Sequence, residues 1–327
     1  MKAFVLSGGG NLGPLQVGAL RALLERGHVP DMVVGCSAGA LSAAFLAREA
    51  SLAQIERLAD LWRSVRRRDI YPGSGLAGLW RFLSGKDSLY DNRSFYAFLQ
   101  RQGTTPMETF ATMGDARLYV TATHLRSGRL HVFGEDDGDR VLDALMASTA
   151  LPPMHPPWLV DGEQYIDGGA VTPLPVRVAL AHGATEIYAL HIGNLMTELP
   201  ENGLVRGMLQ LLNRSVLTML HLQAEHDLLL ARTARHVRMV YFPLRVTNPP
   251  RQTDFSQADR LIDQGYQIAC RRLDSADGSL TVAGLHSRGQ LRLVTLWQRR
   301  FSRVSAPALN EAIQEMDAPE SLDVKPN

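Results

Sequence analysis

The 327-residue sequence contains little cysteine and no large excess of charge of either sign. Its two cysteines, Cys36 and Cys270, cannot build the disulfide framework of a small secreted protein, so we expect a reducing, cytoplasmic compartment. With 34 basic and 33 acidic residues, the formal net charge is +1, which gives no general attraction to nucleic acid. Nucleic acid is therefore not an expected partner, and any preference for an anionic surface must come from local patches.

Long hydrophobic runs and clusters of metal-ligating residues are also missing. No stretch of about 18 or more uncharged apolar residues is present, so we expect no membrane span and at most peripheral contact with a membrane. The apolar run at residues 3–6 is too short for the core of a signal peptide and predicts a first strand. No group of His, Cys, Asp or Glu has the spacing of a metal site, and we expect neither a metal nor a cofactor.

Two glycine-bracketed turns stand near the start of the sequence. Residues 7–13 (SGGGNLG) follow the apolar run 3–6, and residues 35–39 (GCSAG) follow the apolar run 32–34. Between them, residues 14–26 have the apolar spacing of a helix. A strand–helix–strand unit of this kind makes the two strands parallel, so both turns are expected at the carboxyl edge of one sheet. The sequence therefore predicts an α/β fold with chemistry at that edge.

The second turn places Ser37 in a Gly-x-Ser-x-Gly pattern between a strand and a helix of small residues. In that context the pattern is typical of a nucleophile elbow. Gly35 and Gly39 permit the sharp turn, and the N-terminus of the helix favours negative charge that develops nearby. A tight turn with a serine cap explains the pattern about equally well when the pattern is taken alone.

The first turn has two functional interpretations. Gly8, Gly10 and Gly13 match the fingerprint of a dinucleotide-binding loop, so a nucleotide-binding protein is one alternative function. That fingerprint also requires an acidic residue at the end of the second strand, but the strand ends in residues 35–37 and Asp31 stands at its beginning. The loop fits better as an oxyanion hole, because consecutive glycines leave backbone N–H groups uncovered beside a nucleophile.

A serine nucleophile needs a base, and Asp167 has the best position for that role. It follows a short predicted strand and precedes Gly168 and Gly169. Ten histidines make a Ser-His-Asp triad conceivable, but none of them, including His155 and His191, lies in comparable turn chemistry. Structural or surface roles are expected for the histidines. An ordinary Asp-Gly-Gly turn is the alternative explanation for Asp167.

Together these motifs resemble the patatin-like phospholipase family, of the bacterial type, and residues 147–152 and 254–266 add to the likeness. The motif residues are Gly8, Gly9, Gly10 and Gly13 of the loop, Gly35, Ser37 and Gly39 of the elbow, and Asp167, Gly168 and Gly169. The resemblance implies a three-layer α/β/α fold with a mostly parallel sheet, and a serine hydrolase that cleaves acyl esters of lipids without histidine. It assigns Ser37 as nucleophile, Asp167 as base, and N–H groups around Gly9 and Gly10 as oxyanion hole.

One position departs from the pattern of the family. Many relatives have Arg or Lys where this chain has Leu12, and that cation could hold the loop or help to bind an anionic head group. A catalytically weak member that binds lipid or a protein partner is therefore a further alternative. The substrate class that the resemblance implies is a lipid or another acyl ester.

The remaining sequence predicts a catalytic domain over residues 1–195, a helical extension over 196–275 packed on it, and a weakly structured tail over 276–327, basic and then polar. Residues 69–86 mix glycines with apolar side chains, and predict a mobile flap that lines an acyl channel or rests on lipid. A buried irregular segment is nearly as good an interpretation of the flap. A long helix is expected at 204–235, and we interpret its Leu- and Met-rich part, 204–230, as core rather than as a membrane element.

Overall fold

One mixed sheet organises the computed structural model, which describes residues 1–73, 80–81, 83–193, 204–234 and 237–275. Across the sheet the spatial order is β5-β6-β3-β2-β1-β7-β8, and β4 pairs with β3 outside this path. The eight strands of the described sheet are β1 (Lys2–Leu6), β2 (Met32–Cys36), β3 (Arg117–His124), β4 (Arg129–Phe133), β5 (Trp158–Val160), β6 (Glu163–Asp167), β7 (Glu186–Ile192) and β8 (Arg238–Leu244).

The central strands are parallel, as the sequence predicts. β1 pairs in parallel with β2 and β7, and Leu6 at its end stands opposite both Gly35 and Leu190. The pairs β2–β3 and β7–β8 are also parallel, whereas β4, β5 and β6 are antiparallel to their neighbours. All four apolar residues of β1 are fully buried, which is typical of a central strand covered on both faces.

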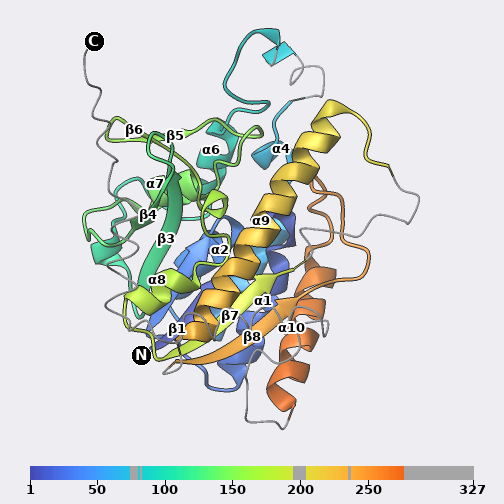
Figure 1. The fold of residues 1–327 in the computed structure, drawn as a ribbon. Coiled ribbons are helices and arrows are strands. Elements are labelled where there is room, and N and C mark those ends of the chain that lie inside the picture. The colour runs from blue at the N-terminus through green and yellow to red at the C-terminus, as the bar shows by residue number, and fades with distance from the viewer. Residues whose placement is uncertain (74–79, 82, 194–203, 235–236, 276–327) are drawn as a thin grey trace, which may run out of the picture. The chain divides into compact units, whose positions relative to one another are not determined.

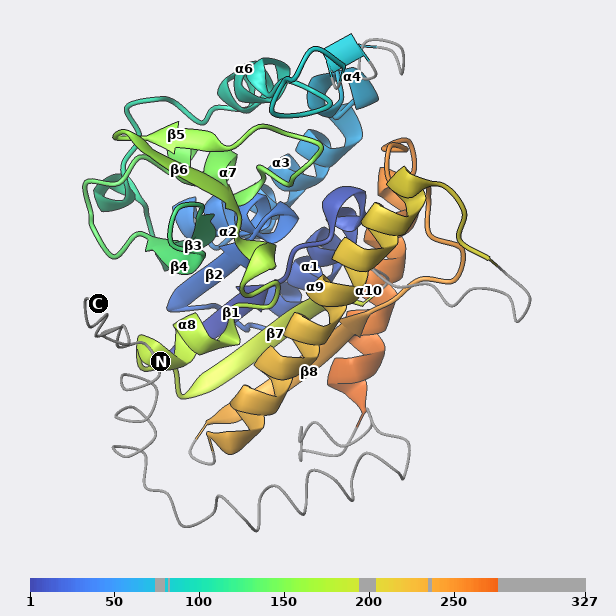
Figure 2. The ribbon, with the colours of Figure 1, turned by 45° about the horizontal axis from the view of Figure 1, so that its top comes forward.

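Helices cover both faces of the sheet, so the three-layer α/β/α prediction is confirmed (Figure 2). The α-helices of the described residues are α1 (Pro14–Glu25), α2 (Ala38–Arg48), α3 (Leu52–Ser64), α4 (Arg67–Ile70), α6 (Arg93–Arg101), α7 (Val141–Ser148), α8 (Val176–Ala181), α9 (Met208–Thr233) and α10 (Ala258–Asp274). Short 3₁₀ turns are η1 (Gly10–Leu12), η2 (Phe110–Thr112) and η3 (Gly168–Ala170). The sequence patterns did not predict α4 or the three 3₁₀ turns.

The two helical layers differ in their contacts. α1, α2, α3 and α10 pack on the face to which Phe4, Leu6 and Val33 contribute, and these residues belong to one large hydrophobic cluster. α8 contacts β1, β2 and β7 from the other face and also contacts α9 (Figure 1). All described residues belong to one compact unit.

Two glycines let α1 and α10 approach closely. A Cβ atom at Gly18 of α1 would collide with the carbonyl oxygen of Ile262, and one at Gly265 of α10 would collide with the carbonyl oxygen of Leu15. Backbone therefore packs on backbone at this crossing, which only glycine permits at both positions. Because α1 begins directly after the glycine loop, the packing of α10 on α1 also holds the end of that loop in place.

The interpretation of α9 as core is wrong for its first half. Near its C-terminal end the helix is buried through Ala224, Asp227 and Leu228. In the first half, Met208 and Met219 are 70% and 63% exposed, and Leu211 is also exposed. No described element covers that outer face, while the inner face borders a pocket. The composition of the helix showed that it is apolar, but it did not show which of its faces other elements would cover.

The predicted flap is only partly described. Ile70 and Tyr71 turn inward, whereas Trp80 and Leu83 are 65% and 73% exposed. The flap therefore has both buried and exposed apolar groups. Its residues 74–79 and 82, and the predicted tail 276–327, lie outside the described residues.

Candidate active site

Ser37 stands on a strained turn between β2 and α2. Its backbone angles are φ 53° and ψ −123°, in a region that residues other than glycine rarely occupy. A Cβ atom at Gly39 would collide with the carbonyl oxygen of Leu6, so the turn lies tightly against the end of β1. Strain of this kind is characteristic of functional sites, where the surrounding structure holds it in place. The elbow geometry predicted from the Gly-x-Ser-x-Gly pattern is present.

A second serine supports this turn from α7. The backbone N–H of Ser37 donates a hydrogen bond to Oγ of Ser148 at 2.8 Å, and Ser148 is fully buried. The bond fixes the orientation of the peptide that precedes the Ser37 side chain. Sequence reasoning placed Ser148 within a stretch that resembles the family but gave it no role.

Asp167 ends β6 and is 4% exposed. Its carboxylate lies beside the Ser37 side chain and accepts hydrogen bonds from the Gly169 N–H at 2.8 Å and from the Cys36 thiol at 3.7 Å. Burial raises the pKa of Asp167 to about 6, because desolvation of the charge outweighs these hydrogen bonds, which favour the carboxylate. The carboxylate is thus a stronger base than an exposed one and adjoins the Ser37 hydroxyl.

The glycine loop presents two unused donors to the same space. The N–H of Gly8 donates to the carbonyl of Pro173 at 3.0 Å, and that of Gly13 to the carbonyl of Gly10 at 3.2 Å. Among the described residues, no hydrogen bond involves the N–H of Gly9 or Gly10. Gly10 has φ +55°, and a Cβ atom at Gly8 would lie 3.3 Å from Cβ of Ser37. The loop therefore lies against the serine with two N–H groups available for an oxyanion.

The histidines with a buried side chain have structural partners. His191 shares a 2.7 Å hydrogen bond with the Tyr241 hydroxyl, and burial lowers its pKa to about 3. His155 does line the pocket, but its Nε2 lies 2.8 Å from the carbonyl of Ile70 and its ring stacks on Tyr71. Neither contact involves Ser37. The structural roles expected for these two residues agree with their geometry.

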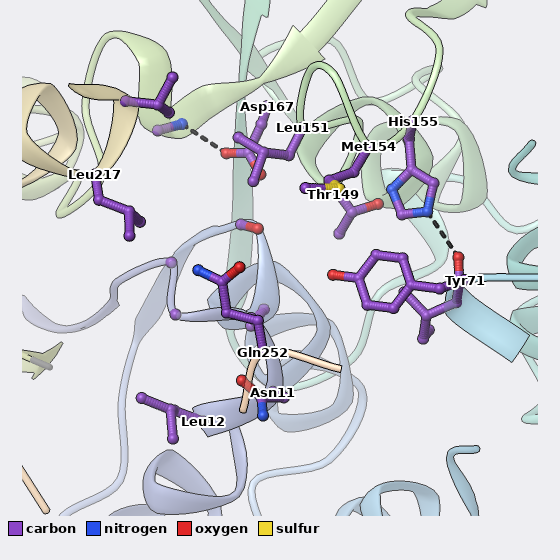
Figure 3. Close-up of a pocket in the computed structure, with 18 of the residues that line it drawn as sticks. Asn11, Leu12, Tyr71, Thr149, Leu151, Met154, His155, Asp167, Leu217 and Gln252 are labelled. Carbon is purple, nitrogen blue, oxygen red and sulfur yellow. Dashed lines mark hydrogen bonds between the residues drawn. The ribbon is translucent and has the colours of Figure 1, made fainter. Parts of the chain in front are cut away.

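Ser37 and Asp167 open into a pocket of about 630 Å³ (Figure 3). Its lining is mostly apolar, and α9 and the segment that follows β8 both contribute to it. The apolar lining includes Leu12, Leu41, Leu61, Trp62, Val65, Ile70, Phe95, Phe98, Leu151, Met154, Leu217 and Leu220. Pockets of this size and lining bind ligands with substantial apolar surface.

Asn11 connects the glycine loop to a distant segment. It is 7% exposed, and its Nδ2 donates 2.8 Å hydrogen bonds to the carbonyls of Arg251 and Asp254. Figure 3 shows Gln252, from the same segment, extending into the pocket from the side opposite Asp167. Sequence reasoning missed these residues, because their pairing joins positions 240 residues apart and no local pattern signals it.

Leu12 is buried in the pocket wall, being 5% exposed, and it belongs to the main hydrophobic cluster. The side chain at this position therefore borders the space where a ligand would lie. In the part of the chain that the structure describes, no group of three or more His, Cys, Asp or Glu side chains could hold a metal ion. Within that same part, no helix combines the length and the hydropathy that a bilayer crossing requires.

Comparison with known proteins identifies the family to which the chain belongs. The patatin-like phospholipase family model matches residues 4–180, which is more than half of the chain. Lysophospholipase NTE1 of Mycosarcoma maydis is 32% identical over 194 residues, which cover 58% of this chain and 10% of that protein. Patatin-like phospholipase domain-containing protein 7 of Rattus norvegicus is 31% identical over 202 residues, covering 59% and 14%. The chain thus matches a small part of these much longer relatives.

Among solved structures, VipD from Legionella pneumophila aligns with a TM-score of 0.43 and 16% identity, covering 84% of this chain and 67% of VipD. The residues matched by the family model include the glycine loop, the elbow and the Asp-Gly-Gly turn. The chain belongs to the patatin-like phospholipase family.

Proposed function

We propose that the protein is a serine hydrolase that cleaves carboxylic acyl esters of lipids, with Ser37 as nucleophile and Asp167 as base. The observation that carries the proposal is that the Ser37 side chain, on its strained turn, lies beside the buried carboxylate of Asp167. Two N–H groups that bond to no described residue, those of Gly9 and Gly10, and a mostly apolar pocket adjoin that pair. The names of the relatives, which include lysophospholipases, support a lipid ester as substrate.

The chemistry follows from these positions. Oγ of Ser37 attacks the ester carbonyl carbon while its proton passes to Asp167, and the N–H groups of Gly9 and Gly10 stabilise the oxyanion. The intermediate collapses, the bond to the leaving alcohol breaks, and the proton on Asp167 passes to that alcohol. Water then gives a proton to Asp167 and attacks the acyl-serine, and the second intermediate releases the fatty acid and restores the Ser37 hydroxyl.

A series of p-nitrophenyl esters from short to long acyl chains tests this function directly. We expect turnover that rises with chain length until the apolar pocket is filled. A folded wild-type protein that hydrolyses none of these esters, and none of the lysophospholipids offered beside them, would overturn the proposal. Such a result would leave a lipid-binding relative without catalytic activity.

Leu12 gives a prediction about the head group. Leu12→Arg is expected to change the ratio of kcat/KM for a lysophospholipid to that for a neutral ester by about tenfold, because a cation would enter the pocket wall. Both rates are measured on the same preparation, with Leu41→Met, a conservative change elsewhere in the pocket wall, as control. Equal changes in the two rates would refute a role of this position in head-group selection.

We also propose that the protein acts as a peripheral protein on a lipid surface in the cytoplasm. The segment that follows α4 and the first turns of α9 lie at the same end of the unit in both ribbon views (Figures 1 and 2). Trp80 and Leu83 are exposed there, as are Met208 and Leu211 of α9. Exposed apolar groups at one end favour insertion into the interface of a bilayer.

Replacing Trp80 and Leu83 together by serine tests the surface contact. We expect co-sedimentation with liposomes to weaken by roughly tenfold or more, because each large side chain contributes about 1–2 kcal/mol when buried in an apolar phase. The matched control replaces Met107 and Leu159, which are also exposed, by serine. Unchanged liposome binding in the first variant, with the fold intact, would contradict the proposal.

A further inference from the structure

The segment that follows β8 forms part of the pocket wall although it lies well beyond the residues that the family model matches. Pro249, Pro250, Arg251 and Gln252 all border the pocket. The two prolines restrict the backbone of this segment, since each fixes its own φ angle. This part of the lining is thus a stiff segment that brings two polar side chains, Arg251 and Gln252, to the pocket.

Hydrogen bonds hold this segment against the glycine loop. Besides the two bonds from Asn11, the N–H of Asp254 donates to the carbonyl of Arg251 at 2.8 Å. The Asp254 carboxylate in turn accepts hydrogen bonds from the Ser256 N–H at 2.9 Å and from its hydroxyl at 2.7 Å. The backbone of Arg251 therefore has a fixed place directly beside the glycine loop that lies against Ser37.

The charges of the lining residues favour an anionic ligand. Among the described residues that line the pocket, Asp167 is the acidic residue and Arg214 and Arg251 are the cations. Asp167 is engaged with Ser37. The Arg251 side chain is exposed and forms no ion pair with any residue that the structure describes. Its guanidinium is available to a ligand in the pocket.

We propose that Arg251 binds the phosphate of the lipid head group during ester hydrolysis and thereby selects substrates with an anionic head group. This inference rests on the proposed function. At the glycine loop this chain has Leu12 and no cation. The inference assigns the role of that cation to Arg251, in a segment about 240 residues further along the chain. A guanidinium binds phosphate through two parallel N–H···O bonds, so both charge and geometry favour this ligand.

The test compares two substrates that differ only in the phosphate, 1-acylglycerol 3-phosphate and 1-acylglycerol with the same short acyl chain. Both are used as monomers, below the concentration at which micelles form, so that a lipid surface plays no part. For Arg251→Gln we expect kcat/KM on the phosphate substrate to fall roughly ten- to hundredfold relative to kcat/KM on 1-acylglycerol. Arg251→Lys keeps the charge and is expected to retain part of the preference.

Arg271→Gln provides the matched control, because Arg271 is an exposed arginine of α10 that does not line the pocket. Glycerol 3-phosphate, added as a competitor, shows whether the phosphate group binds without an acyl chain; competition that Arg251→Gln weakens supports the same site. Equal losses on both substrates in Arg251→Gln would overturn the inference while leaving ester hydrolysis intact. Absence of turnover on every substrate by wild type would instead refute the proposed function.

Discussion

Replacing Ser37 by alanine is expected to reduce ester turnover by roughly 10⁴-fold or more, because no covalent acyl intermediate can then form. The remaining N–H groups of Gly9 and Gly10 and the pocket would still bind the substrate. We therefore expect kcat to fall far more than KM changes. No other single substitution in the site should reduce activity as much, because the other groups only assist the step in which Ser37 forms a bond to the substrate.

Covalent labelling with a fluorophosphonate probe tests whether Ser37 is the nucleophile without the use of a substrate. The wild type is expected to be labelled at Ser37, and Ser37→Ala is expected to be unlabelled. Ser42→Ala is a matched control, because Ser42 is a buried serine of α2, the helix that follows Ser37, and its hydroxyl donates to Gln16 at 3.3 Å. Labelling that persists in Ser37→Ala would show that another nucleophile reacts and would remove the basis of the mechanism.

Asp167→Asn is expected to reduce turnover by roughly 10³-fold or more, because an amide retains the shape of the carboxylate but cannot accept a proton from Ser37. In the wild type, kcat/KM for a neutral ester should rise with pH and level off above an apparent pKa of about 6, the value to which burial raises Asp167. The base acts in its ionised form, so activity is lost as pH falls through that value. A profile that is flat between about pH 5 and 8 would contradict the assignment of Asp167 as base.

The same substitution is expected to stabilise the fold at pH 8. Because the pKa of Asp167 is raised in the folded state, folding favours the protonated form, and keeping the carboxylate ionised costs stability above about pH 6. A shift of this size corresponds to about 3 kcal/mol at most, so Asp167→Asn should unfold at higher denaturant concentration by about 1–3 kcal/mol at pH 8.

That gain should shrink as pH falls through about 6 and disappear below about pH 3, where the wild-type carboxyl is protonated in both states. Denaturant unfolding at several pH values measures the difference, with Asp143→Asn as control at another carboxylate. An Asp167→Asn variant that is less stable than the wild type at pH 8 would show that the hydrogen bonds to the carboxylate outweigh its burial.

The sequence predicted those parts of the fold that depend on local patterns. The apolar run before the glycine loop marks β1, and the spacing after it marks α1. The Gly-x-Ser-x-Gly pattern predicted a sharp turn because only a few residue types permit one, and Ser37 has the positive φ angle that such a turn requires. Asp167 could be placed because its turn follows a recognisable hairpin, β5–β6.

Long-range pairings could not be predicted in the same way. Asn11 is one polar residue in a glycine loop, and nothing near it in sequence indicates that it would contact Arg251 and Asp254. Ser148 supports the Ser37 turn only because α7 packs beside α2. For α9, composition suggested burial, but burial depends on what the rest of the chain places beside each face, and its first half has an uncovered outer face.

The hydrogen bonds of Asn11 can form only late in the synthesis of the chain, because their acceptors lie about 240 residues further along the sequence. Ser37 and the glycine loop leave the ribosome early, yet the carbonyls that hold Asn11 belong to Arg251 and Asp254, and the helix that packs on Gly18 follows them. A growing chain that ends before these residues has the nucleophile but lacks the anchors of its oxyanion loop. Synthesis therefore completes the hydrolytic centre only when nearly all of the described chain has been made.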